Sequence, residues 1–136
     1  MERPCVFAPE KLVRSKRAGR NVAASIAAFE RAAALNPNYV NWYFGVALVR
    51  AGDPRRAIDV INAYVRLDPL YAPFASGMLG FAHYMLKDYA QALPLLRDCV
   101  SVSPNMRGGH VWLAATYAQM GKLEEARVEV AEVMRI

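Results

Sequence analysis

Residues that could do chemistry are sparse in this 136-residue chain, and they are not grouped at the spacing that a reaction needs. His83 and His110 could bind a metal ion, but neither has a cysteine or histidine at metal-ligand spacing. Glu124 and Glu125 could form a pair of catalytic carboxylates, yet they fall in the first turn of a predicted helix, where acidic side chains stabilise the helix dipole. The sequence therefore predicts no catalytic site, no metal, no cofactor and no enzyme.

Signals for binding anions are also weak. Gly108 and Gly109 form an isolated pair and do not make a glycine-rich phosphate loop. Residues 1–20 contain six basic and two acidic residues, so they carry +4 of the net charge of +5. Such a segment could contact nucleic acid or an anionic surface, but Phe7 is its one aromatic residue. We interpret residues 1–20 as a basic leader, flexible or forming a degenerate helix, and keep nucleic-acid or anionic-surface binding as an alternative function.

The composition suits a chain with a sizeable core and no membrane segment. The hydrophobic fraction is 55%, but no apolar run reaches the length of about 20 residues that a membrane span needs. The N-terminus lacks the apolar core of a signal peptide. Cys5 and Cys99 are too few for a disulfide framework, and Cys99 falls at a small, buried position of a predicted helix. These features predict a cytoplasmic protein.

Start and stop signals divide the chain after residue 20 into helices. Asn21 is predicted to cap the first of them. Asp53 followed by Pro54 is a strong start signal, because aspartate caps the first turn and proline lacks only an N–H that this turn leaves unpaired. Asp88 caps a later helix, which Pro94 should bend locally. The predicted helices span about residues 21–35, 39–51, 54–67, 72–86, 89–102, 106–120 and 122–135.

The helices form pairs that recur with a period near 34 residues. Pro37, Pro69 and Pro104 lie 32 and 35 residues apart, each close to the end of a pair. Small residues recur at fixed offsets between them, where two helices can cross closely. They are Gly45, Gly80 and Ala114 in the first helices, and Ala57, Ala92 and Ala126 in the second helices. This period is typical of stacked helical hairpins, which usually bind other proteins.

The pattern resembles the tetratricopeptide repeat (TPR) family over roughly residues 21–136. The resemblance implies an all-α fold, a TPR-type α-solenoid of antiparallel helix pairs forming a right-handed superhelix. About three and a half repeats would occupy residues 21–136. The first complete pair departs from the family pattern: Trp42 stands one place nearer its glycine than the family's tryptophan, and Tyr64 occupies a slot that is usually small.

In TPR proteins the first helices of the pairs line the concave side of the superhelix, so the resemblance places a partner-binding groove there. TPR domains that clamp a terminal carboxylate present lysine, arginine and asparagine on this side. This chain presents apolar residues, with Arg50 at the edge, so we predict no such clamp. A large apolar patch usually marks an interaction site, although these side chains could instead fill a tight superhelix or mediate self-association. The predicted groove consists of Tyr39, Trp42, Val46, Val49, Phe74, Met78, Phe81, Tyr84, Val111 and Trp112.

Helical spacing assigns another set of side chains to the core between helices. The expected core is Phe44, Leu48, Ile61, Val65, Leu79, His83, Leu96, Val100, Leu113, Tyr117, Val130 and Met134. No polar capping helix follows the last pair, so Val130, Val133 and Met134 would keep an uncovered side. We therefore expect a homo-oligomer that covers its ends, or a piece of a longer protein.

The function that the sequence favours is protein–protein interaction, as an adaptor or scaffold with a largely apolar concave groove. Its partner would be a protein or peptide with an apolar segment. Residues 103–136 are also similar to the TPR tails that follow the catalytic domain of some bacterial adenylate cyclases. The first alternative is therefore a regulatory segment of a bacterial cyclase-like signalling protein, without any of the cyclase's metal-binding carboxylates.

Overall fold

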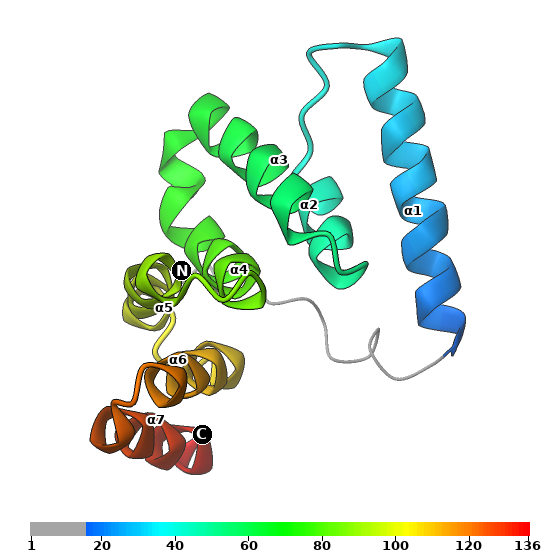
Figure 1. Ribbon diagram of the computed structural model, residues 1–136. Helices are drawn as coiled ribbons and strands as arrows, with labels where there is room; N and C mark the ends of the chain where they lie inside the picture. Colours follow the sequence, from blue (N-terminus) through cyan, green and yellow to red (C-terminus); the bar gives the residue numbers. More distant parts are fainter. Residues whose placement is uncertain (1–15) are drawn as a thin grey trace. The chain divides into compact units, whose positions relative to one another are not determined.

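The computed structural model describes residues 16–136, and over these residues the chain consists of helices with no strand (Figure 1). The helices are α1 (Lys16–Leu35), α2 (Trp42–Arg50), α3 (Pro54–Leu67), α4 (Ala72–Met85), α5 (Tyr89–Val102), α6 (Arg107–Gln119) and α7 (Leu123–Arg135), with a short 3₁₀ helix at Pro69–Tyr71. Cys5 and most of the predicted basic leader lie outside the described residues, so their roles stay predictions.

The same turn joins the two helices of each pair, α2–α3, α4–α5 and α6–α7. One residue of each turn has a positive φ, which is +83° at Gly52, +59° at Lys87 and +75° at Gly121. In all three turns the next N–H donates to the carbonyl five residues earlier, at 2.9 Å. This bond belongs to the Schellman motif, which satisfies carbonyls that the end of a helix leaves unpaired. The predicted pairing of helices is confirmed, but nothing in the sequence marks Lys87 as left-handed.

Side-chain caps fix where three helices begin. The carboxylates of Asp53 and Asp88 accept the backbone N–H three residues further on, at 3.3 and 3.4 Å, so α3 and α5 begin as predicted. Asn41 Oδ1 accepts the N–H two residues further on, at 2.8 Å, and its side-chain nitrogen donates to the Tyr39 hydroxyl at 3.0 Å. The predicted start of this helix at Tyr39 was wrong, because Asn41 caps α2 and the helix begins at Trp42.

The first helix begins earlier than predicted. It starts at Lys16 and ends at Leu35, so it runs across residue 20, the expected end of the basic leader. Asn21 lies inside the helix, and its backbone carbonyl accepts the hydroxyl of Ser25 at 2.8 Å. Alanine is the strongest helix former, and it recurs on both sides of Asn21. Helix propensity therefore outweighs the capping tendency of Asn21, and the predicted start was wrong.

The described residues form two compact units, residues 16–69 and residues 70–136. In the first unit α1 packs on α2, and α2 packs on α3. The rings of Phe29 and Phe44 stack with their centres 5.4 Å apart, and the guanidinium of Arg56 lies 5.9 Å from the Phe44 ring centre. At Gly45 the helices approach so closely that a Cβ would overlap Cγ1 of the buried Ile61. The predicted close crossing at Gly45 is confirmed.

In the second unit α4, α5, α6 and α7 pack in sequence order. Ala92, Leu96 and Leu113 form its buried centre. A Cβ on Gly80 would lie 2.7 Å from Leu96 Cγ, so only glycine lets α4 and α5 come this close. The small residues predicted at this crossing, Gly80 and Ala92, therefore have the packing role that their spacing indicated.

Half of the predicted core is buried, and the two members that are exposed lie on α7. The buried members are Phe44, Leu48, Ile61, Leu79, Leu96 and Leu113, whereas Val65, His83, Val100 and Tyr117 are partly exposed. Val130 and Met134 are exposed, Met134 by 80%. The prediction was wrong for these two, because α7 packs on α6 through the stripe of Ala126, Glu129 and Val133, which leaves Val130 and Met134 towards solvent.

Candidate functional site

The predicted groove residues of the first unit are mostly buried. Trp42 is 4% exposed, and its ring centre lies 6.4 Å from that of Tyr64 on α3. Val46 and Val49 lie on α2 and are buried, whereas Tyr39 precedes the helix and is partly exposed. Tyr64 occupies a position of the repeat where a small residue was expected. Its ring packs beside that of Trp42, which is how the helix pair α2–α3 accommodates both rings.

The second unit brings three predicted groove residues together. The ring centre of Trp112 on α6 lies 4.1 Å from that of Phe81 and 5.3 Å from that of Tyr84, both on α4. Tyr89, at the start of α5, joins them with its ring 5.5 Å from Tyr84. We call these four residues the aromatic cluster, and all four are partly exposed.

The aromatic cluster packs against the buried core of the second unit. Tyr84 and Trp112 pack against the buried cluster formed by Ala92, Leu96 and Leu113. Val111, next to Trp112 on α6, is 41% exposed. Because these rings are packed on the core and also partly exposed, a partner can contact them without disrupting the packing of the unit. Of the other predicted groove residues on α4, Met78 is buried, and the side chain of Phe74 lies outside the described side chains.

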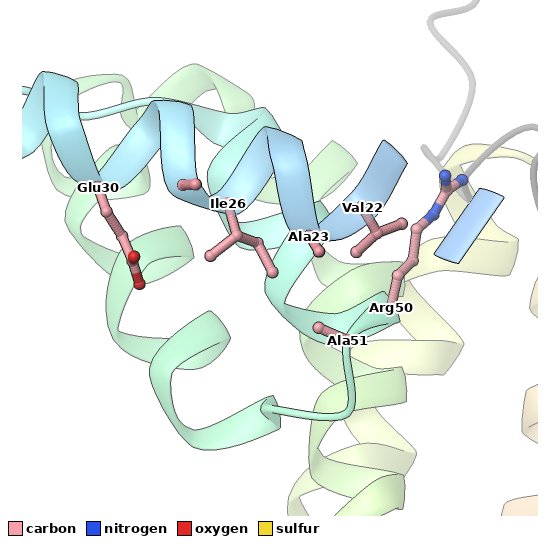
Figure 2. Close-up of a pocket in the computed structure, with 7 residues that line it drawn as sticks. Val22, Ala23, Ile26, Glu30, Arg50 and Ala51 are labelled. Atoms are coloured by element: carbon pink, nitrogen blue, oxygen red, sulfur yellow. The ribbon is translucent and has the colours of Figure 1, made fainter. Parts of the chain in front are cut away.

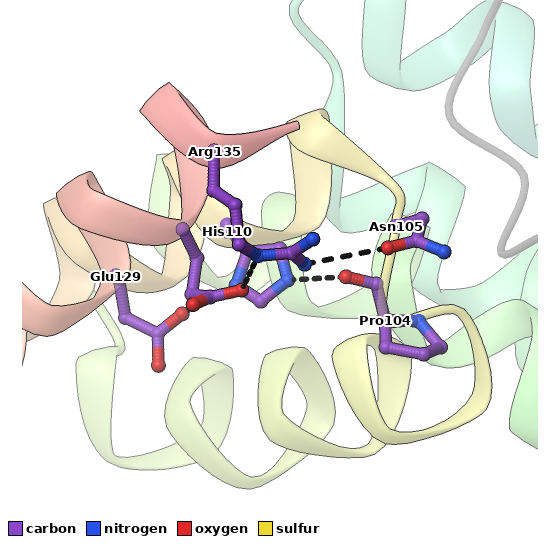
Figure 3. A network of polar contacts seen from close by, with 6 residues as sticks. Pro104, Asn105, His110, Glu129 and Arg135 are labelled. Atoms are coloured by element: carbon purple, nitrogen blue, oxygen red, sulfur yellow. Dashed lines mark hydrogen bonds and ion pairs between the residues drawn. The ribbon is translucent and has the colours of Figure 1, made fainter.

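His110 is part of a buried polar network rather than a metal site (Figure 3). Its Nδ1 lies 2.5 Å from a carboxylate oxygen of Glu129 on α7, and its Nε2 lies 2.8 Å from the carbonyl oxygen of Pro104. Arg135 donates to Asn105 Oδ1 at 3.3 Å and joins α7 to the same turn. Both ring nitrogens of His110 are thus engaged, and the network fastens α7 to the start of α6. No sequence signal paired His110 with Glu129.

The other residues considered for metal binding or catalysis, His83 and Glu124, also form structural ion pairs and lie apart from one another. His83 Nδ1 lies 3.5 Å from a carboxylate oxygen of Asp88, in the turn between α4 and α5. Glu124 is exposed and pairs with Arg127 one helical turn later. Among the described residues no three histidine, cysteine or acidic side chains gather as metal ligands would. Over the same part of the chain, no helix has the length and apolar character needed to cross a membrane.

The repeated turn and the close crossings agree with the sequence comparisons. One model of the tetratricopeptide repeat matches residues 10–72 and 44–101, and another matches residues 83–136. The chain belongs to the tetratricopeptide repeat family. No curated protein sequence matches it. A TPR array presents an extended surface for binding other proteins, so this TPR chain is a protein–protein interaction module.

Solved structures with a similar fold include MamA. The alignment with a crystal structure of MamA covers 96% of this chain and 76% of the MamA chain, with a TM-score of 0.73 and 21% sequence identity. The alignment with a MamA structure from Desulfovibrio magneticus RS-1 covers 94% of this chain and 75% of that chain, with a TM-score of 0.74 and 20% sequence identity. At these identities the likeness concerns the fold, and it supports the predicted all-α, TPR-type solenoid. Neither alternative function gains support from these matches, and the resemblance to cyclase tails stays a prediction.

Proposed function

We propose that this TPR module binds an apolar segment of another protein, with the aromatic cluster as the main contact. The observation that carries the proposal is the partial exposure of Phe81, Tyr84 and Trp112 on the first helices α4 and α6. Aromatic side chains are enriched at the centres of protein interfaces, because they bury a large area and have few rotatable bonds. Val111 extends the apolar surface beside the cluster.

The remaining predicted groove residues fall into two groups. Tyr39, which belongs to the other unit, and Phe74, whose side chain is not described, stay predictions from the sequence alone. Trp42, Val46, Val49 and Met78 are buried, so they would support the groove rather than touch the partner. No described cation lies in the aromatic cluster, so we expect apolar contact rather than capture of a carboxylate.

Peptides selected from a random display library on the full chain test this proposal. We expect the selected peptides to be rich in apolar residues and to bind with little dependence on salt, because few charges are involved. Phe81→Ala should weaken binding by about 30-fold, which corresponds to about 2 kcal/mol at an interface hot spot. Leu67→Ala removes an exposed apolar side chain at the end of α3 and should leave affinity unchanged, so it is the matched control.

The same experiment separates the groove from the basic leader. A variant lacking residues 1–20 also loses the first turn of α1, so its helical content must be compared with that of the full chain before its binding is interpreted. If this variant loses peptide binding while Phe81→Ala keeps it, the cluster is not the binding site. Salt-dependent binding of a DNA duplex or of anionic vesicles that is lost with residues 1–20 would support the nucleic-acid or anionic-surface alternative.

We also propose that the chain associates with itself through α7. Leu123, Val130 and Met134 are exposed and lie on one stripe of this helix, since they are separated by seven and four residues. Contiguous exposed apolar side chains favour association, because burial removes them from water. A cytoplasmic location and the absence of catalytic activity complete the proposal. The absence of catalytic activity rests on the dispersed chemical residues. The location stays a prediction from the sequence, because Cys99 is disulfide-bonded and its sulfur does not favour a reducing compartment.

A further inference from the structure

Arg50 combines positive charge with incomplete hydrogen bonding. Its Nε and Nη2 atoms are buried and have no hydrogen-bond partner. Burial lowers the pKa of its guanidinium, but arginine stays charged in proteins. Buried N–H groups in native proteins nearly always have an acceptor, and buried charges are normally paired. Arg50 is therefore suited to bind an anionic group that reaches it from outside the chain.

A nearby arginine in the same unit shows the usual arrangement. Arg56 Nη2 donates to Glu30 Oε1 at 2.9 Å, and both side chains are about half-exposed. The hydrogen bond from Glu30 raises the pKa of the Arg56 guanidinium. Glu30 thus already has a cationic partner, and no described carboxylate pairs with Arg50.

Arg50 borders a pocket between α1 and the end of α2 (Figure 2). The cavity has a volume of about 440 Å³, within the range of roughly 300–1,000 Å³ that is usual for ligand sites. Val22 and Arg50 lie at one end of it and Glu30 at the other, with Ile26 between them. The pocket exists because the α1 residues facing this space include alanines, whose side chains are too short to fill it.

Arg50 also lines a second pocket, which α1 and α2 form. It has a volume of about 170 Å³, and Phe29, Tyr43 and Val46 contribute to its lining. Val22 and Arg50 line both pockets. Arg50 therefore borders two mainly apolar spaces, each able to receive a side chain.

We propose that Arg50 binds the side-chain carboxylate of an acidic residue within a partner protein, whose aliphatic neighbours enter the two pockets. The planar guanidinium matches a carboxylate, with which it can form two parallel hydrogen bonds. A dianionic phosphate fits less well, because Glu30 is the other described charged residue of the lining and would repel it. Since Arg50 borders two pockets that can each receive a side chain, an internal acidic residue with neighbours in both directions suits the site better than a chain terminus. The site shares no residue with the aromatic cluster.

Two capped heptapeptides test the proposal on the full chain without any substitution. Both carry a leucine two positions to each side of the central residue, which is glutamate in one and glutamine in the other. We expect the glutamate peptide to bind at least about tenfold more tightly, because a hydrogen bond to a charged group contributes more than a neutral one. Its binding should also weaken as salt is raised, and it should shift the NMR signal of the Arg50 Nε–H group, assigned with an Arg50→Lys variant.

Three variants extend the test within the same unit. Arg50→Met removes the charge and keeps the length of the side chain, so it should abolish the preference for glutamate. Ala27→Leu fills the larger pocket and should weaken both peptides. Arg66→Met removes the same charge at an exposed position of α3 and should bind as the wild type does.

Several results would overturn the proposal. One is equal binding of the two peptides to the wild type, and another is the absence of measurable binding of the glutamate peptide. A third is unchanged binding to Arg50→Met at an unchanged thermal midpoint. If Arg50→Met does not fold, the comparison of the two peptides on the wild type still decides the question.

Discussion

Gly80→Ala should destabilise the protein, although alanine is the better helix former. Replacing glycine by alanine in a helix interior favours folding by about 1 kcal/mol. At Gly80, however, the new Cβ would lie 2.7 Å from Leu96 Cγ and 3.2 Å from the Leu96 backbone nitrogen. Leu96 is fully buried, so the overlap is relieved only by moving α5 away from α4. Overpacking costs roughly 1–3 kcal/mol, and contact with the Leu96 backbone places this site in the upper part of that range. After the gain in helix propensity is subtracted, we expect a net loss of about 1–2 kcal/mol.

Gly109→Ala is the matched control in the same unit. The new Cβ would lie 3.0 Å from Val100 Cγ1 and 3.3 Å from Cys99 Sγ, and neither contact involves backbone. A small shift of the Val100 side chain relieves the closer contact. Cys99 is disulfide-bonded and less free to move, but its contact is the longer one, so the gain in helix propensity should balance or exceed the strain. We expect a change in the free energy of unfolding between zero and a gain of about 1 kcal/mol.

Urea denaturation followed by far-ultraviolet circular dichroism measures both effects. Leu96→Ala adds a test of the cause, because it removes the branch that the new Cβ meets. Alone it should cost about 2–5 kcal/mol, but together with Gly80→Ala the loss should be smaller than the sum by about 1 kcal/mol or more. If Gly80→Ala is as stable as the wild type, or if the two losses simply add, the crossing is looser than the distances indicate.

Two further predictions concern the turns and the last helix. Lys87→Gly should raise the free energy of unfolding by about 0.5–1 kcal/mol. The left-handed conformation, with φ of +59°, costs a residue with a side chain about 1–2 kcal/mol, and the greater freedom of glycine in the unfolded chain offsets part of this gain. A lower midpoint in urea would contradict this prediction. Sedimentation at micromolar concentrations should detect a dimer or larger species, and Val130→Glu with Met134→Glu should convert it to a monomer. A wild type that sediments as a monomer at all concentrations would refute self-association through α7.

The elements that the sequence predicted best are those fixed by local chemistry. Asp53 and Asp88 cap helices because their carboxylates accept hydrogen bonds from N–H groups three residues further on. Such a local contact can be recognised from the sequence alone. The small residues at Gly45 and Gly80 were predicted because the repeat places them in register. Lys87 could not be predicted, since its left-handed conformation is imposed by the hairpin and not by its own preference.

The candidate site was less predictable, because a helical stripe does not say which of its members another helix covers. Val46 and Phe81 occupy equivalent places in the repeat, each one residue after the small residue of its helix, yet Val46 is buried and Phe81 is partly exposed. The link between His110 and Glu129 joins two helices across 19 residues, and neither type of residue specifies such a partner. Arg50 was noted only at the edge of the groove, because unsatisfied hydrogen bonding can be seen only in three dimensions.

Ionic strength separates the two binding modes proposed for this protein. Contact with the aromatic cluster buries apolar area, and salt at ordinary concentrations changes that contribution little. Pairing at Arg50 joins opposite charges that a partner must bring together, so salt weakens it by screening. A partner that uses only Phe81 and its neighbours should therefore keep its affinity from low to moderate salt, whereas a partner that uses Arg50 should lose affinity steadily. For a partner that uses both, Arg50→Met should remove the salt dependence and leave the remaining affinity sensitive to Phe81→Ala.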